Sequence, residues 1–400
     1  MSRYTKYNDK GHNMKRLPKQ LYLYPTEMML ALYLTVLGYM IPVIRETFDL
    51  SLTAAGLFST LQSIGLFVAL ILCFCVFSGL NKARVITVSM VLLSLCMVLL
   101  GLNRIVFVLY VLFFFIGFFN GVSDTLQNAL IMDLSAHKPK FYTGLLHALW
   151  ATAGVAGPYF ALALRGDYTN AFVALGIVTA AATMLLIFGF RGSIRKPLLQ
   201  SRAHMGTIKK LVQILKVRGM KLFVSMAFFN CFTQISFVYF ISAYVSGQKG
   251  GIDGALSLAL LFAGFLIARV LYSLFGHRFC AFKVMAVMNT ITVCAFVVML
   301  LVQNDVLTGA MILIGGMGIS IAVPGLVVEA CEVVPHDTAA ASALVFFGIG
   351  LGAFVGPLIT GAIGDAAGLQ IGLLAATGVL LPFIALSWLA ARRFAHEAAK

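Results

Sequence analysis

The chain has 400 residues, of which 61% are hydrophobic and 11% are charged, and its formal net charge is +15. A soluble domain has about a quarter of its residues charged, so this composition excludes a water-soluble globular protein. The basic charge leaves two classes of partner open, a nucleic acid and a membrane. The positions of the charges along the chain decide between them.

Twelve apolar runs are long enough to cross a bilayer, which takes roughly 20 residues in a helix. Continuous runs of this length favour helices over a β-barrel. The polar segment 1–24 is not followed by a cleavage site for a signal peptidase, so we interpret it as a retained tail. The sequence therefore predicts an all-α membrane protein with spans near 26–45, 54–79, 85–103, 105–134, 141–164, 170–190, 222–246, 254–276, 284–303, 306–334, 339–364 and 370–391.

The basic residues gather on one predicted side of the membrane. Arg45, Arg104, Arg165 and Lys249 fall in the opposite loops and Arg269 falls in a span, which leaves 24 of the 29 Lys and Arg on the side of the N-terminus. By the positive-inside rule this side is cytoplasmic. We expect a multi-pass protein of the cell (inner) membrane with both termini cytoplasmic, in contact with lipid and not with nucleic acid.

Several glycines and prolines recur at a separation of 199 residues and in corresponding helices of the two halves. This repeat predicts two pseudo-symmetric six-helix bundles, a plan typical of secondary transporters. The domains are then a tail (1–24), an N-terminal bundle (25–190), a basic linker (191–221), a C-terminal bundle (222–391) and a tail (392–400). The linker is either a surface-lying amphipathic segment or a solvated loop. The repeated pairs are Gly65 and Gly264, Gly117 and Gly316, Gly157 and Gly356, and Pro158 and Pro357.

Four motifs resemble those of the major facilitator superfamily, over nearly the whole chain. Gly79-Leu-Asn-Lys-Ala-Arg84 is similar to its inner-loop signature, with Asn81 where the family has an Asp, and Gly276-His-Arg-Phe-Cys-Ala-Phe-Lys283 is a weaker repeat of it. Gly117-Phe-Phe-Asn-Gly-Val-Ser-Asp-Thr-Leu-Gln-Asn128 in the fourth span resembles a motif of the sugar-permease-like branch. So does Leu145-Leu-His-Ala-Leu-Trp150 with Gly154-Val-Ala-Gly-Pro158 in the fifth. The resemblance implies that spans 1, 4, 7 and 10 line the substrate cavity.

The fourth span carries a polar stripe, because Asn120, Asp124 and Asn128 follow one another at a spacing of four residues. Gln127 lies beside the stripe. Ionisable groups inside a membrane are costly and are functional by default. We expect Asp124 to bind the coupling proton and the amides to bind substrate. A hydrogen-bonded cluster that joins helices is the alternative.

His147 and Arg269 lie at a similar depth to Asp124, about 10–13 Å from the inner ends of their helices. A histidine titrates near neutral pH, so His147 could relay a proton with Asp124. Arg269 could hold an anionic substrate or neutralise an acid such as Glu329. Hydrogen bonding of His147 to a nearby carbonyl or amide and a fixed ion pair of Arg269 are equally open alternatives.

Further candidate substrate residues lie on the first, fifth and seventh spans. Asn230 and Gln234 are one turn apart on the seventh, and Tyr33 on the first could stack on a ring. Trp150 could border the cavity, although packing is the favoured interpretation for the aromatic residues. Glu27, near the inner mouth of the first span, is either a gating acid or a surface acid.

A second set of residues is predicted to govern gating. Asp133 could pair with Lys82 or Arg84 and close the inner side, and a weak surface ion pair is the alternative. Small residues and prolines at matching positions of both halves are typical of the faces that move in a rocking mechanism. The candidate gating residues are Gly79, Lys82, Arg84, Asp133, Gly157, Pro158, Gly356 and Pro357.

No phosphate loop, nucleophile motif or metal-ligand spacing occurs, so we expect neither an enzyme nor a metal or other cofactor. The leading hypothesis is a monomeric, proton-coupled transporter that moves a small polar solute, a sugar or a sugar-like compound, by alternating access. The alternatives are a proton-driven drug or metabolite exporter and an organic-anion transporter of the same fold. A non-transporting membrane sensor is a further, less favoured reading.

Overall fold

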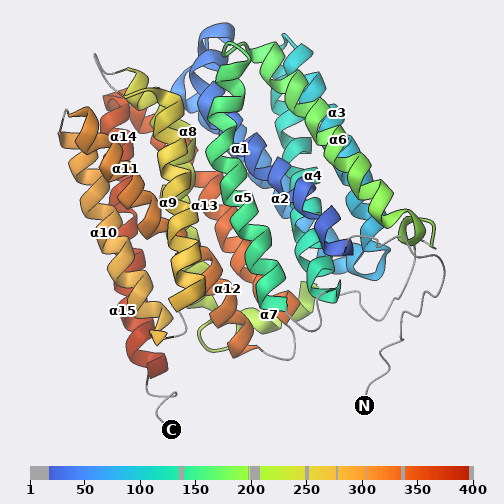
Figure 1. Cartoon of the computed structure of the whole chain (residues 1–400). Helices are drawn as coiled ribbons and strands as arrows, with labels where there is room; N and C mark the ends of the chain where they lie inside the picture. The colour runs from blue at the N-terminus through green and yellow to red at the C-terminus, as the bar shows by residue number, and fades with distance from the viewer. Residues whose placement is uncertain are drawn as a thin grey trace.

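The computed structural model describes residues 18–134, 139–196, 198, 208–247, 252–275, 278–302, 304–334 and 338–395. Twelve segments of this part of the chain are helices long and apolar enough to cross a membrane, which confirms the predicted fold class and number of spans. Most of the tail predicted at 1–24, residues 199–207 of the linker and residues 396–400 lie outside the described residues. In Figure 1, α7 and the end of α15 lie on the lower side, and α14 lies toward the upper side.

The twelve spans alternate in direction between the lower and upper sides (Figure 1). The short α7 carries the amphipathic sequence of the linker. The helices are η1 (Lys19–Tyr22), α1 (Tyr24–Phe48), α2 (Leu52–Cys75), η2 (Phe77–Gly79), α3 (Lys82–Leu102), α4 (Val106–Leu134), α5 (Pro139–Ala163), α6 (Tyr168–Ile194), α7 (Ile208–Leu215), α8 (Met220–Ser246), α9 (Gly254–Phe275), α10 (Ala281–Leu301), α11 (Asp305–Ser320), α12 (Ala322–Val333), α13 (Thr338–Ala367), α14 (Leu369–Gly378) and α15 (Leu380–Ala395).

Two predicted spans are each built from two helices instead of one. Helix α11 ends at Ser320, four residues before Pro324, and α14 ends at Gly378, four residues before Pro382. A proline has no N–H for the carbonyl four residues earlier and its ring clashes with that carbonyl, so the helix is interrupted there. The spans predicted at 306–334 and 370–391 are each confirmed as one span, and the break inside each was not predicted.

The glycine repeat corresponds to the same helix contact in each half. A Cβ atom placed on Gly65 of α2 or Gly117 of α4 would lie 2.1 or 2.0 Å from a backbone oxygen of the other helix. The glycines 199 residues later, Gly264 of α9 and Gly316 of α11, would meet backbone oxygens at 2.3 and 2.4 Å. Both pairs of helices therefore pack backbone against backbone, which only glycine allows at these positions.

The second repeated pair also makes equivalent contacts, within each half. A Cβ on Gly157 of α5 would lie 1.9 Å from the Thr35 hydroxyl oxygen of α1, and one on Gly356 of α13 would lie 2.5 Å from the carbonyl oxygen of Phe232 on α8. Helices α5 and α13 continue through the prolines that follow these glycines. The two sites join α5 to α1 and α13 to α8, and their role in gating stays a prediction.

The two halves meet on the upper side along α2 and α13. The Ser59 hydroxyl donates to the carbonyl oxygen of Ala353 at 2.6 Å, and the Thr60 hydroxyl donates to that of Phe354 at 2.9 Å. About two helical turns further along α2, the ring centre of Phe67 lies 5.1 Å from that of Phe347 on α13. These contacts run along α2 from Ser59 to Phe67, or roughly 12 Å, so the upper side between the halves is closed.

Asp365 at the upper end of α13 caps α2, because its carboxylate accepts from the backbone N–H groups of Leu52 and Thr53 at 2.8 and 2.7 Å. Replacing Asp365 by Ala is expected to remove this link and to open the upper side more often. An N-cap is worth about 1 kcal/mol, which corresponds to roughly a fivefold rise in the open population. A cysteine at Ser63 in a cysteine-free background should react correspondingly faster with an impermeant maleimide added from the upper side.

The control for this prediction is Asp167→Ala, since Asp167 caps α6 through Asn170 of its own helix and joins no second element. It should leave the labelling rate at position 63 unchanged. Equal rates in the Asp365→Ala protein and the original protein would show that the cap does not hold the two halves together.

Candidate transport site

A polar cluster lies between α1 and α4 in the first half. Glu27 is 1% exposed and lies close enough to Asp124 for the two carboxylates to repel one another when both are charged. The Thr26 hydroxyl donates to Gln127 Oε1 at 2.6 Å, and Asn128 Nδ2 donates to Asp124 Oδ1 at 2.7 Å. The polar stripe of α4 thus faces the start of α1, and two acids share one site.

Both acids occupy positions that their helices favour. Glu27 is in the first turn of α1, where the helix dipole stabilises negative charge. Asp124 and Asn128 are one turn apart on α4, so the amide can reach the carboxylate. Within the described residues, Glu27 Oε2 and the side-chain nitrogen of Gln127 are buried without a hydrogen-bond partner. Asn120, one turn from Asp124 along the stripe, is partly exposed.

A basic and aromatic cluster lies where α5 of the first half meets α9 of the second. The Arg269 guanidinium carbon lies 5.1 Å from the ring centre of Trp150, and Trp150 lies 5.6 Å from Phe262. His147 is near enough to Arg269 for electrostatic repulsion between them. The sequence placed His147 and Arg269 at a similar depth in the membrane, and in the structure they are electrostatic neighbours. Asp124 was placed at the same depth, but its charged neighbour is Glu27.

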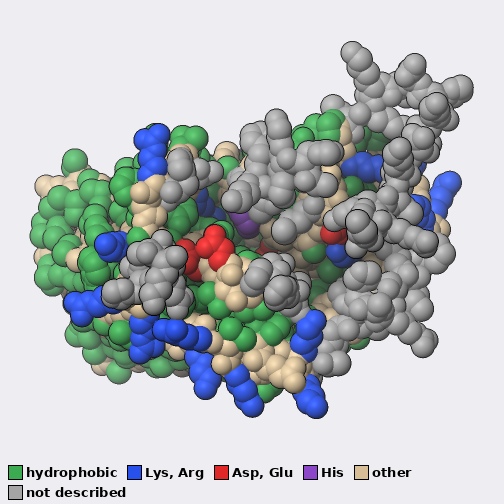
Figure 2. Space-filling view, turned by 90° about the horizontal axis from the view of Figure 1, so that it is seen from below, with side chains coloured by type: hydrophobic (Ala, Val, Ile, Leu, Met, Phe, Trp, Pro, Cys, Tyr) green, Lys and Arg blue, Asp and Glu red, His purple; other side chains and the backbone are tan. Residues whose placement is uncertain are grey.

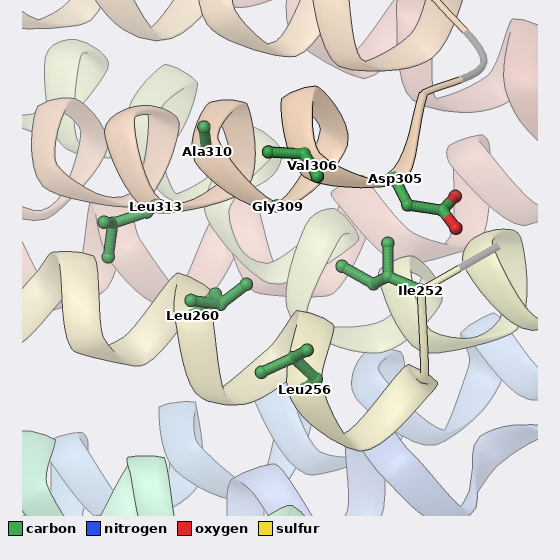
Figure 3. Close-up of a pocket in the computed structure, with 8 residues that line it drawn as sticks. All are labelled: Ile252, Leu256, Leu260, Asp305, Val306, Gly309, Ala310 and Leu313. Carbon is green, nitrogen blue, oxygen red and sulfur yellow. The ribbon is translucent and has the colours of Figure 1, made fainter.

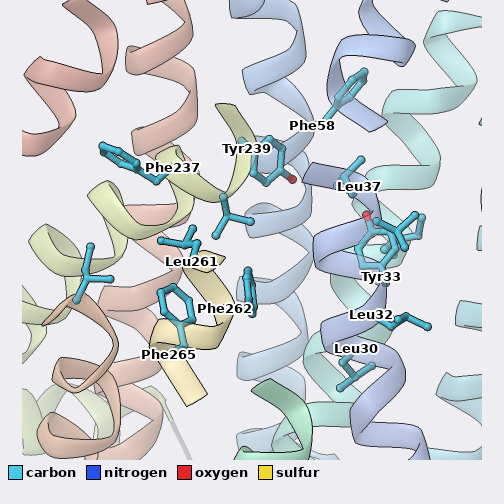
Figure 4. Packing of buried hydrophobic residues seen from close by; sticks show 14 of the residues in the cluster. Leu30, Leu32, Tyr33, Leu37, Phe58, Phe237, Tyr239, Leu261, Phe262 and Phe265 are labelled. Carbon is cyan, nitrogen blue, oxygen red and sulfur yellow. The ribbon is translucent and has the colours of Figure 1, made fainter. Parts of the chain in front are cut away.

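A third link between the halves joins Tyr33, a candidate from the sequence analysis, to two residues that the sequence analysis did not select, Gln62 and Tyr239. Gln62 Nε2 of α2 donates to the Tyr33 hydroxyl of α1 at 2.6 Å, and the Tyr239 hydroxyl of α8 donates to Gln62 Oε1. Figure 4 shows the two tyrosines on facing helices with their hydroxyls turned toward the space between them. Gln62 is a polar residue in an apolar run, which is the signal that could have identified it.

The amides of α8 lie deeper in the second half. Asn230 is fully buried, and its Nδ2 donates to Asn289 Oδ1 at 3.3 Å and to the carbonyl oxygen of Ile319 at 3.1 Å. These partners belong to α10 and α11, so Asn230 joins three helices of the same half. Gln234 is 7% exposed, and its Oε1 has no hydrogen-bond partner among the described residues. Substrate binding by either residue stays a prediction.

The remaining candidates lie toward the lower side. Lys82 Nζ and Asp133 Oδ2 form an ion pair of 2.6 Å between the start of α3 and the end of α4, with Asp133 57% exposed. Exposed pairs of this kind contribute little to stability. Arg84 is exposed, and Gly79 is buried at the end of η2. Glu329 of α12 interacts with Glu332 and Tyr272, and the described residues contain no Arg269–Glu329 ion pair.

Figure 3 shows a separate groove between α9 and α11 at the upper side. Its volume is about 420 Å³, and its lining is apolar apart from Asp305 at one end. The groove lies away from α1, α4 and α5, where the polar candidates lie. It is therefore no part of the candidate site for a polar solute.

Twelve spanning helices, with polar and charged side chains held between them, define a multi-pass membrane protein of the secondary-transporter type. The model of the Major Facilitator Superfamily matches residues 23–339. The chain belongs to this superfamily, as its sequence motifs indicated. A search of curated protein sequences finds no match.

Solved transporter structures share the fold over nearly their whole length. A bacterial homologue of the human lysosomal transporter Spinster, in an inward-facing and occupied conformation, has a TM-score of 0.75 and 16% identity, with 96% of this chain and 98% of that chain covered. The Escherichia coli fucose:proton symporter FucP has a TM-score of 0.67 and 16% identity, with 94% and 99% covered. A variant of the nucleoside transporter NupG has a TM-score of 0.71 and 11% identity, with 94% and 99% covered.

Proposed function

We propose that this protein moves a small polar solute across the cell membrane by alternating access and that a proton bound between Glu27 and Asp124 couples the movement to the proton gradient. The observation that carries the proposal is that the buried Glu27 and the partly buried Asp124 are near enough to repel one another when both are charged, with Glu27 Oε2 left without a partner among the described residues. For the class of solute we keep the prediction made from the sequence, a sugar or a sugar-like compound. The FucP and NupG folds are consistent with it.

Two neighbouring carboxyl groups inside a membrane do not readily carry a negative charge at the same time. Like charges at short distance in a medium of low polarity repel strongly, so one of the pair holds a proton in preference. The ion pair of Lys82 and Asp133 is the one recorded among the described residues, so neither Glu27 nor Asp124 has a basic partner. A site of this kind takes up a proton when it faces the acidic side and releases it when a change of conformation or a bound solute alters its surroundings.

The orientation is part of the proposal. The lower side carries many Lys and Arg side chains, with acids among them toward the middle (Figure 2). The positive-inside rule then makes it the cytoplasmic side. Because α2 and α13 close the upper side, we infer a state that opens toward the cytoplasm, with Asp365 and Ser59 in the outer gate.

The experiment that tests the proposal has two steps. A thermal-shift screen of neutral sugars, sugar acids, sugar phosphates and nucleosides selects compounds that stabilise the purified protein by binding its folded state. The compounds selected are then added to proteoliposomes filled with the pH indicator pyranine. We expect the lumen to acidify when solute enters and the signal to vanish with a protonophore. Solute entry without movement of protons would contradict proton coupling.

A further inference from the structure

Arg269 is an unpaired cation inside a spanning helix. It lies within the span Gly254–Tyr272, and its Nε is buried without a hydrogen-bond partner among the described residues. No ion pair of Arg269 is recorded in this part of the chain. An arginine is always charged, so its desolvation has to be offset by a partner.

The neighbours of Arg269 within the described helices do not supply that partner. His147 across the α5–α9 contact is itself basic and repels the guanidinium when protonated. The acids have other neighbours, since Glu27 interacts electrostatically with Asp124, and Glu329 with Glu332 and Tyr272. Two basic groups thus share a site with no described anion.

Aromatic rings cover one side of the guanidinium. Trp150 and Phe265 have their ring centres 5.1 and 5.8 Å from the Arg269 guanidinium carbon, and the Phe262 ring contacts both rings at a tilt. Figure 4 shows Phe262 and Phe265 next to one another on α9. A cation–π contact is worth about 0.5–2 kcal/mol and uses the face of the guanidinium, which leaves its N–H edge free for hydrogen bonds.

His147 and Arg269 each keep part of the side chain exposed. The two residues belong to different halves of the protein, so a ligand that contacts both joins the halves. A site with this position is suited to a transported solute, because its geometry changes when the halves move.

We propose that the transported solute carries an oxyanion, a carboxylate or a phosphate ester, which binds between Arg269 and His147 while an apolar or ring portion lies against Trp150 and Phe262. This inference rests on the proposed transport function and names the chemical class of its substrate. A guanidinium edge binds carboxylate and phosphate oxygens in pairs, and a histidine adds a further donor. The sugar-like solute proposed above is then an acidic one, which carries a carboxylate or a phosphate ester.

Trp150 provides the measurement, because the chain has two tryptophans and Trp388 is 42% exposed on α15, far along the chain from this site. In a Trp388→Phe protein, emission reports on Trp150. Benzoate and phenyl phosphate are titrated in detergent solution, with benzamide as the neutral probe of the same shape. We expect a saturable change with one or both anions, which also shows whether carboxylate or phosphate is preferred, and none with benzamide.

Arg269→Gln in the same background is expected to weaken anion binding by about tenfold or more, since it removes a charge-assisted pair of hydrogen bonds. Arg269→Lys should retain part of the affinity for the anion. Arg278→Gln changes an exposed arginine beyond the end of α9 and should retain all of that affinity. Gel filtration and the melting temperature establish that each variant is folded. If Arg269→Gln does not fold, His147→Gln and Arg269→Lys test the inference in its place, and each should weaken anion binding.

An unchanged titration in Arg269→Gln, an equal response to benzamide, or no response to either anion at millimolar concentration would overturn the inference. The titration uses no proton gradient, so a failure of proton coupling would leave its result unaffected. Conversely, a failure of the anion-binding inference would not affect the pyranine experiment, which tests proton coupling.

Discussion

Replacing Asp124 by Asn is expected to abolish proton-driven accumulation of the solute, by a factor of about 10² or more, while exchange of solute across the membrane continues. The amide has the size of the carboxyl group and its oxygen can still accept from Asn128, so the local geometry is kept. It cannot bind and release a proton in the physiological range. Catalytic proton transfers lose about 10²–10⁴ in rate when the titrating group is removed, and coupling through one site should be affected as strongly.

The measurement compares uptake driven by an imposed pH gradient with solute counterflow in the same proteoliposomes. Glu27→Gln is expected to behave in the same way, because either acid alone lacks the neighbour that makes the pair share a proton. Asp305→Asn is the matched control, since this acid is exposed at the start of α11 and lies away from the candidate site. Undiminished accumulation in the Asp124→Asn protein would remove Asp124 from the coupling mechanism.

The number and class of the helices could be predicted from the sequence because the bilayer fixes the length of an apolar span. The same argument cannot place a break inside a span. Pro324 and Pro382 interrupt their helices, whereas Pro158 and Pro357 are accommodated within continuous ones. The packing around each proline differs. It is set by neighbouring helices, so it cannot be predicted from the local sequence.

The candidate site was predicted in part, for a related reason. Depth along a helix follows from residue number, and it suggested that Asp124, His147 and Arg269 form one layer. Lateral distance does not follow from residue number, so the sequence could not show that Asp124 faces Glu27 and that His147 faces Arg269.

The amides of α8 illustrate a further limit. Asn230 and Gln234 share a helix face, but periodicity does not say whether that face is turned toward the cavity or toward the same half. Asn230 is turned toward α10 and α11. The Tyr33–Gln62–Tyr239 link involves three helices from both halves, a combination that no local pattern encodes.

Gly117→Ala is expected to destabilise the protein severely, although alanine is the better helix former. Alanine gains about 1 kcal/mol over glycine in helix propensity. Its Cβ, however, would lie 2.0 Å from the backbone oxygen of Gln62, closer than any real Cβ contact. The obstacle is backbone and cannot rotate away, so α2 and α4 must separate along their length. Overpacking of this kind costs about 1–3 kcal/mol or more, which exceeds the propensity gain.

The repeat supplies a second test of the same contact. Gly316→Ala in the other half meets the backbone oxygen of Leu261 at 2.4 Å and is expected to lower stability in the same direction but less strongly. Gly192→Ala, in the last turns of α6, meets nothing within 4 Å and should be neutral or slightly stabilising. The readout is the temperature at which half of the detergent-solubilised protein is lost from the monodisperse peak in gel filtration. Because all three variants add the same methyl group to a helical glycine, propensity acts equally in each, and a different order must come from the helix contacts. A melting temperature of Gly117→Ala at or above that of Gly192→Ala would show that α2 and α4 are not held together by this backbone approach.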